Sequence, residues 1–223
     1  MINEIKKEFQ LIKYAPNRKS NIVFMIVFLI YGSVCLFFDG MPGMTQLTGV
    51  CMIDCGIMFI VQMVNGVYGT GLAMAAPSRK KLSVLYGAVI NTVLIFVVNI
   101  IAGGILIYVM RDNGIDDAII KMLLIVIGLF NIVISVYTGT AFKFFVPSLI
   151  AFFVMFSVIV VAYMFVRNGF FLEYFDGIPL VIAYLISLLE TIIGGFLYYV
   201  VAKAMYKLPY DKMALSAGFR KEN

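Results

Sequence analysis

The sequence predicts an all-α polytopic membrane protein, with six transmembrane helices and an N-terminal amphipathic helix lying in the membrane interface. Of the 223 residues, 63% are hydrophobic and only 13% are charged. The mean hydropathy is +1.03, which is too apolar for a soluble domain of this length. The charges also cluster between six long apolar stretches, each able to cross about 30 Å of hydrocarbon at about 1.5 Å per residue.

The interfacial helix is expected over residues 2–14, before a proline at position 16. Its apolar residues recur at helical spacing, and charged or amide side chains occupy the other face. The residues that characterise this helix are Ile5, Lys6, Phe9 and Lys13. A simple positively charged tail is the alternative interpretation.

The remainder of the chain is expected to form a single transmembrane domain that, with this helix, covers residues 1–223. We place the spans near 20–38, 45–74, 82–110, 118–140, 144–166 and 178–206. The second and third are close to thirty residues long, or about 45 Å if they are helical throughout. Their extra length either projects into the cytoplasm or is absorbed by helix tilt.

The distribution of basic residues orients these spans. With the N-terminus inside, 14 of the 17 Lys and Arg residues lie on the cytoplasmic side, and only Arg111, Lys121 and Arg167 lie outside. The positive-inside rule then places both termini in the cytoplasm. The outer loops are acidic, and residues 168–179 pair aromatic side chains one turn apart, as expected either for a short outer helix or for an aromatic belt.

Polar residues inside the spans recur on single helix faces. The candidates for a cargo pathway are Asp54, Gln62, Asn65, Asn91 and Glu190. Asp54 and Glu190 are the carboxylates within the spans, at a similar depth of about 15 Å. Exposing such an acid to lipid costs at least about 2.5 kcal/mol, so each is expected either to line a substrate or proton pathway or to bridge helices.

Enzymatic, metal-binding and nucleic-acid-binding functions are not expected. The chain has no histidine, and its three cysteines lie inside the apolar stretches. No catalytic or nucleotide-binding motif is present, so the chain is expected to bind no cofactor itself. The net charge of +5 is interpreted as a topology signal, because the cations lie at the ends of the spans.

The loop between the second and third spans carries the most informative motif, Pro77-Ser78-Arg79-Lys80-Lys81. Together with the amphipathic opening Glu4-Ile5-Lys6-Lys7-Glu8-Phe9, it resembles the small six-span permease subunits of type-2 ABC exporters. The likeness is to compact bacterial exporters of peptides such as phenol-soluble modulins and lantibiotics, and it implies a location in the bacterial plasma membrane. Those permeases carry a similar Pro-x-Ser/Thr-Arg-Lys segment after the second span, although the one-residue spacer is missing in this chain.

The resemblance implies an exporter in which two permease subunits, identical or paralogous, pair with two cytosolic ATP-binding subunits. ATP and Mg would bind to those partner subunits. The loop at 77–81 would act as the coupling helix, braced by the N-terminal helix, and residues 168–179 would correspond to the outer re-entrant helices. The implied cargo is an amphipathic peptide or a lipid-like molecule.

Two other functions remain open. Asp54 and Glu190 would relay protons in a gradient-driven secondary transporter. A small membrane immunity protein that sequesters a membrane-active peptide is the other alternative.

Overall fold

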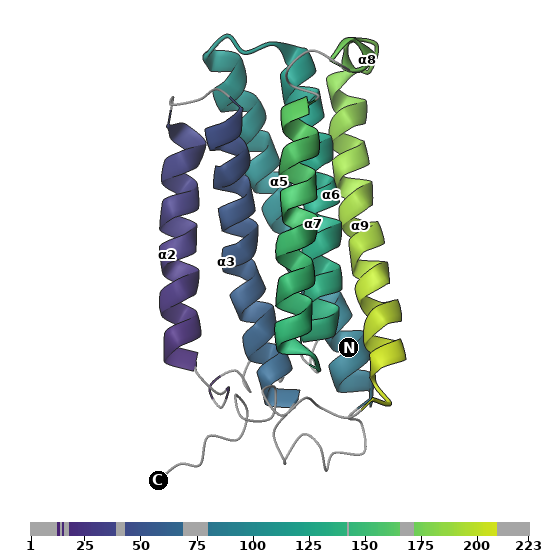
Figure 1. The fold of residues 1–223 in the computed structure, drawn as a ribbon. Helices are drawn as coiled ribbons and strands as arrows, with labels where there is room; N and C mark the ends of the chain where they lie inside the picture. The colour runs from purple at the N-terminus through teal and green to yellow at the C-terminus, as the bar shows by residue number, and fades with distance from the viewer. Residues whose placement is uncertain are drawn as a thin grey trace.

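The computed structural model describes residues 13, 15, 18–38, 43–68, 80–141, 143–165 and 172–208, and within these ranges the chain is helical without strands. The elements are α2 (Arg18–Phe37), α3 (Met44–Tyr68), η2 (Lys81–Tyr86), α5 (Gly87–Asp112), α6 (Asp117–Ala141), α7 (Phe145–Phe165), α8 (Glu173–Asp176) and α9 (Leu180–Met205) (Figure 1). Six helices are long and apolar enough to cross a membrane. The predicted all-α fold with six spans is thereby confirmed.

The helices lie close to the predicted spans. The third, counted through the π-helical η2, is the longest at 30 residues, from Ser83 to Asp112. The second begins at Met44, one residue before the expected start, and is described as far as Tyr68. The expected interfacial helix at 2–14 lies outside the described residues, apart from Lys13. Within 168–179, the four residues Glu173–Asp176 form one turn of helix, α8.

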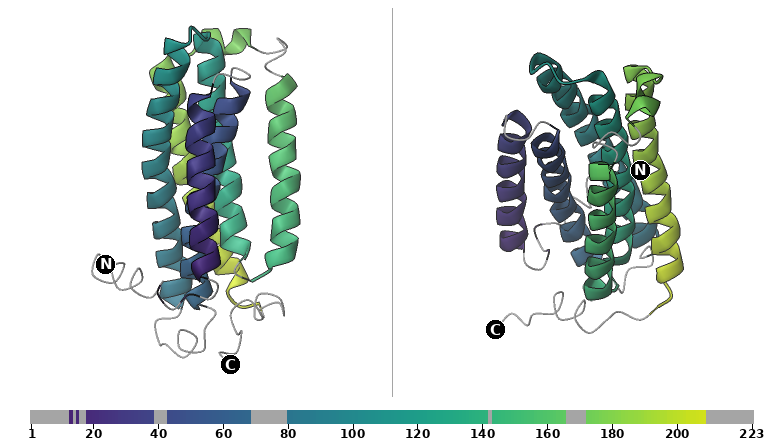
Figure 2. Two further views of the ribbon diagram at one scale, coloured as in Figure 1. Left: turned by 90° about the vertical axis from the view of Figure 1, so that its left-hand side faces the viewer. Right: turned by 45° about the horizontal axis from the view of Figure 1, so that its top comes forward.

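The six long helices run side by side in one bundle, with α6 at its centre (Figures 1 and 2). Helix α6 contacts α3, α5, α7 and α9, whereas α2 packs chiefly on α3 and α7 chiefly on α6. Burial follows this arrangement. In the most apolar 18-residue stretch of each helix, 61% is buried in α3 and in α6, against 11% in α2 and in α7. The two outlying helices therefore present most of their Val, Ile, Phe and Leu side chains to lipid.

Local sequence signals set the helix ends at one side of the bundle. Helix α5 ends before Gly114, whose φ of 67° allows the chain to leave the helix in the left-handed region. Asp116 then caps α6, because its Oδ1 accepts a 3.0 Å hydrogen bond from the Ala118 backbone N–H. An exposed ion pair of 3.0 Å joins Arg111 to Asp117 across this turn.

Glycines allow the closest helix contacts. A Cβ added at Gly128 of α6 would lie 2.9 Å from the Ser187 Cα of α9 and would overlap the Glu190 carboxylate. Two more glycines, Gly139 and Gly194, bring the same two helices together further along. Small residues of this kind let backbones approach and gain van der Waals contact within a membrane, where apolar burial gives little driving force.

Replacing Gly128 with alanine is expected to destabilise the bundle by about 1–3 kcal/mol, because the added methyl group would push α9 away from α6. Gly104→Ala is the matched control, since a Cβ at Gly104 meets nothing within 4 Å. That variant should be neutral or gain up to about 1 kcal/mol of helix propensity. Thermal unfolding of both variants in detergent tests whether the close contact of α6 and α9 stabilises the bundle. Equal unfolding midpoints for the two variants would contradict this role.

Candidate functional site

The polar interior of the bundle contains two groups of side-chain hydrogen bonds. In the first, Thr191 of α9 accepts from two amides: Asn99 Nδ2 of α5 at 2.9 Å and Asn131 Nδ2 of α6 at 3.1 Å. Asn99 Nδ2 also lies 3.2 Å from the Ser187 hydroxyl. All four side chains are buried, with exposures of 0–1%. One threonine hydroxyl thus ties together α5, α6 and α9.

The second group lies nearer the end of the bundle at which the third span begins, and it includes a residue of α3. Asn91 donates to the Ser135 hydroxyl at 3.0 Å and accepts from the Thr138 hydroxyl at 3.2 Å. The Tyr198 hydroxyl donates to Asn65 Oδ1 at 3.0 Å, and Asn65 Nδ2 donates to the Thr138 carbonyl at 3.3 Å. This group therefore links α3, α5, α6 and α9.

The predicted pathway residues fall into two kinds. Gln62, Asn65 and Asn91 make hydrogen bonds to neighbouring helices, Gln62 through a 3.2 Å contact with the Tyr137 hydroxyl. These contacts are those of amides that bridge helices. Their role in moving cargo stays a prediction.

Asp54 and Glu190 differ from these amides because they have buried carboxylate oxygens without a hydrogen-bond partner among the described residues. Asp54 is 0% exposed, and neither of its carboxylate oxygens has a hydrogen-bond partner among the described residues. Glu190 is half-buried, with its Oε2 against Gly128 and likewise without a hydrogen-bond partner. Each lies ten residues from the helix start, at Met44 or Leu180, or about 15 Å deep.

The structure does not bring the two acids together in one site. Asp54 lies on the buried face of α3, whose principal neighbours are α2, α5 and α6. Glu190 lies on α9 at its contact with α6. No group of three His, Cys, Asp or Glu side chains in the described ranges could hold a metal ion.

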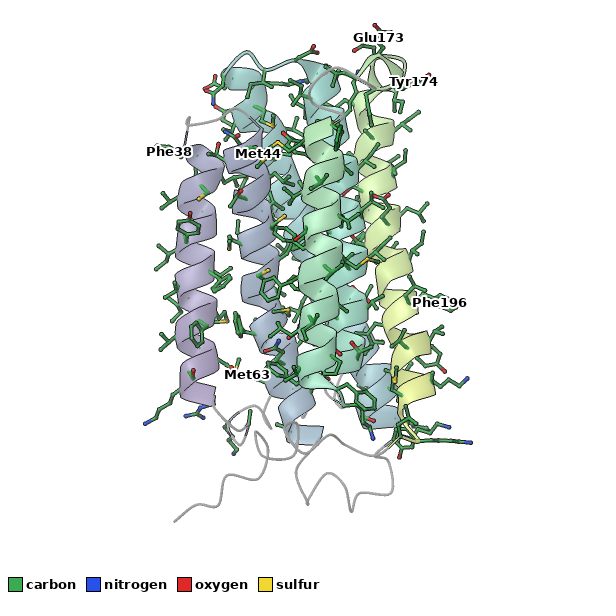
Figure 3. The ribbon with its side chains drawn as sticks, viewed as in Figure 1. Phe38, Met44, Met63, Glu173, Tyr174 and Phe196 are labelled. Atoms are coloured by element: carbon green, nitrogen blue, oxygen red, sulfur yellow. The ribbon has the colours of Figure 1, made fainter. Side chains whose placement is uncertain are left out.

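The two ends of the bundle carry opposite charge (Figure 3). At the acidic end, α5 and α6 meet and α8 carries Glu173, and Lys121 ties α6 to α8 by donating to the Asp176 carbonyl at 3.4 Å. At the basic end, the described residues include eight cations and no carboxylate. The cations are Lys13, Arg18, Lys19, Lys80, Lys81, Lys143, Lys203 and Lys207.

The predicted coupling segment is described only in part. Pro77, Ser78 and Arg79 lie outside the described residues, as do Ile5, Lys6 and Phe9 of the predicted interfacial helix. Lys80 and Lys81 are exposed and stand where the 30-residue third span begins. The first turn of that span is π-helical, over Lys81–Tyr86. Single π-helical turns often occur at functional sites.

Sequence reasoning missed the polar face of α6. Asn131, Ser135 and Thr138 are spaced four and three residues apart, so the helical period that marked α3 was also present here. The structure makes them the partners of Asn91 and Thr191.

Comparison of the chain with protein-family models, with curated proteins and with solved structures found no match. The composition and the six apolar helices define the class to which the chain belongs, a multi-pass membrane protein.

Thr191→Val is expected to lower stability by about 1 kcal/mol, because it leaves the Asn131 amide without its acceptor and removes one of three acceptors from Asn99. Thr140→Val is the matched control, since the Thr140 hydroxyl bonds only carbonyls of its own helix, at Val136 and Tyr137. Thermal unfolding in detergent should separate the two variants, and an equal loss in both would show that the interhelical bonds contribute nothing.

Proposed function

We propose that the protein is the permease subunit of an ATP-driven exporter that moves amphipathic peptide or lipid-like cargo out of the cell. A separate cytosolic ATP-binding subunit supplies the energy at the basic end, and a second permease subunit completes the pathway. ATP and Mg bind to the partner, so this chain carries no catalytic residue.

The observation that carries the proposal is the position of Lys80 and Lys81. They stand at the start of the longest span, whose 30 residues correspond to about 45 Å, against about 30 Å of hydrocarbon. The surplus length is suited to holding the basic loop off the membrane, where a soluble partner can reach it. Cations at the same end favour a cytoplasmic location for both termini.

The interior of the bundle supports a mechanical role for this helix. The third span carries Asn91 and Asn99, which bond to α6 and α9 at two depths. A force applied at Lys80 and Lys81 is therefore passed to both hydrogen-bonded groups rather than absorbed by a loose helix. Movement of the third span would shift α6 and α9 with it.

Replacing Arg79, Lys80 and Lys81 with alanine is expected to weaken binding of the proposed ATP-binding subunit on the order of tenfold, which corresponds to about 1.4 kcal/mol of docking free energy. Its cargo-stimulated ATPase activity should fall with it. The control replaces Arg18, Lys19 and Lys203, three cations of the same end outside the loop. Co-purification and ATPase assays in nanodiscs give the readout; loss in both variants, or in neither, contradicts the coupling role.

Asp54 favours a second candidate, a gradient-driven transporter. A fully buried carboxyl without a hydrogen-bond partner among the described residues suits a group that gains and loses a proton during transport. The protonated form avoids the cost of a buried charge. The deprotonated form would then require water to enter the bundle, which couples the proton to a conformational change.

This alternative predicts that Asp54→Asn abolishes peptide efflux, measured as peptide uptake into inverted vesicles, and that an uncoupler does the same without any ATP-binding subunit. Asp112→Asn, at an exposed carboxylate of the acidic end, is the control and should leave efflux unchanged. If efflux in Asp54→Asn persists and still requires ATP, the gradient-driven mechanism is excluded and the exporter is favoured.

A further inference from the structure

A groove separates α7 from the rest of the bundle on the side of the basic end. It encloses about 350 Å³, and its lining comes from α6, from α7 and from Met205 at the end of α9. Tyr137, Thr140 and Ser148 supply the only side-chain hydroxyls of an otherwise apolar lining. Three lining residues of α7 are exposed, Pro147, Ala151 and Met155, so the groove opens onto the surface that faces lipid.

Packing explains why the groove exists. Helices α7 and α9 each pack on α6, and α7 stands apart from the other helices in Figure 2. The side chains of α6 between them, including Ile132 and Val136, form the floor. An apolar channel of this kind does not stay empty inside a bilayer, because its walls would lose their van der Waals contacts.

The length of the groove matches one leaflet. Its lining runs from Phe144, directly before α7, to Met155, and these eleven helical steps correspond to about 16 Å. This is half of the roughly 30 Å hydrocarbon core of a bilayer. The groove therefore begins at the basic end of the bundle and stops near the middle of the membrane, as an acyl chain of that leaflet does.

The charge at its open end selects the head group. Lys143, directly before Phe144, is 2% exposed and donates to the Tyr206 and Leu208 carbonyls at 3.3 and 2.6 Å, which joins the α6–α7 connection to the end of α9. Lys207 is exposed and follows the lining residue Met205 by two positions. No carboxylate lies at this end among the described residues, so the local potential is positive and favours an anion.

We propose that this groove is a binding site for an anionic phospholipid of the leaflet at the basic end. One acyl chain lies in the groove between α6 and α7, and the phosphate head group lies beside Lys207. The bound chain supplies the packing that α7 lacks on this side. The residues of this site differ from Lys80 and Lys81, which are proposed to contact the ATP-binding subunit.

Native mass spectrometry tests this on the full chain, with phosphatidylglycerol and phosphatidylcholine of identical acyl chains as probes. The wild-type protein should retain one phosphatidylglycerol molecule in preference to phosphatidylcholine. Lys207→Gln should reduce phosphatidylglycerol retention about fivefold, as expected for one cation near an anionic lipid, and leave phosphatidylcholine unchanged. Equal retention of both lipids by the wild-type protein would overturn the head-group assignment.

Ala151→Phe fills the groove and should abolish retention of both lipids. Ala162→Phe is the matched control: it makes the same change on nearly the same face of α7, eleven residues further on, outside the groove. Should Ala151→Phe fold poorly, Ala151→Leu should give a smaller loss in the same direction. Unchanged phosphatidylglycerol in the Ala151 variants overturns the proposal, as does a wild-type dimer that these variants dissociate, because a second copy would then fill the groove.

Discussion

The arrangement of the bundle depends on how closely α9 approaches α6. Gly128, Gly139 and Gly194 remove the side chains that would hold the two backbones apart. Because the helices touch, the short hydroxyl of Thr191 reaches amides on both α5 and α6. A larger distance between α6 and α9 would leave these amides unpaired in a hydrocarbon environment, where each unpaired amide costs free energy. Glycine packing and amide pairing therefore reinforce one another.

This centre contrasts with two peripheral helices. Helices α2 and α7 expose most of their length to lipid and each packs chiefly on a single neighbour. The limited packing of α7 leaves the apolar groove beside it.

Most of the fold could be predicted from the sequence, because hydropathy and charge are local properties. The six spans follow from apolar length, and the opposite charge of the two ends follows from counting Lys and Asp at their boundaries. The candidate site was harder to predict from the sequence than the fold. The sequence placed Asn65, Asn91 and Asp54 on polar faces, but the same pattern fits an amide that bridges helices and an acid that has no partner.

By itself, the sequence determined that the chain is a multi-pass membrane protein and at what depth its acids lie, since both depend on spacing along one helix. Only the tertiary structure decided which helix is central, which amides are paired and that Asp54 and Glu190 occupy separate places. The physical reason is that hydrogen bonds and glycine contacts form between helices far apart in the chain. Which residues become partners, such as Asn65 and Tyr198, depends on how the helices pack and not on the spacing of polar residues along one helix.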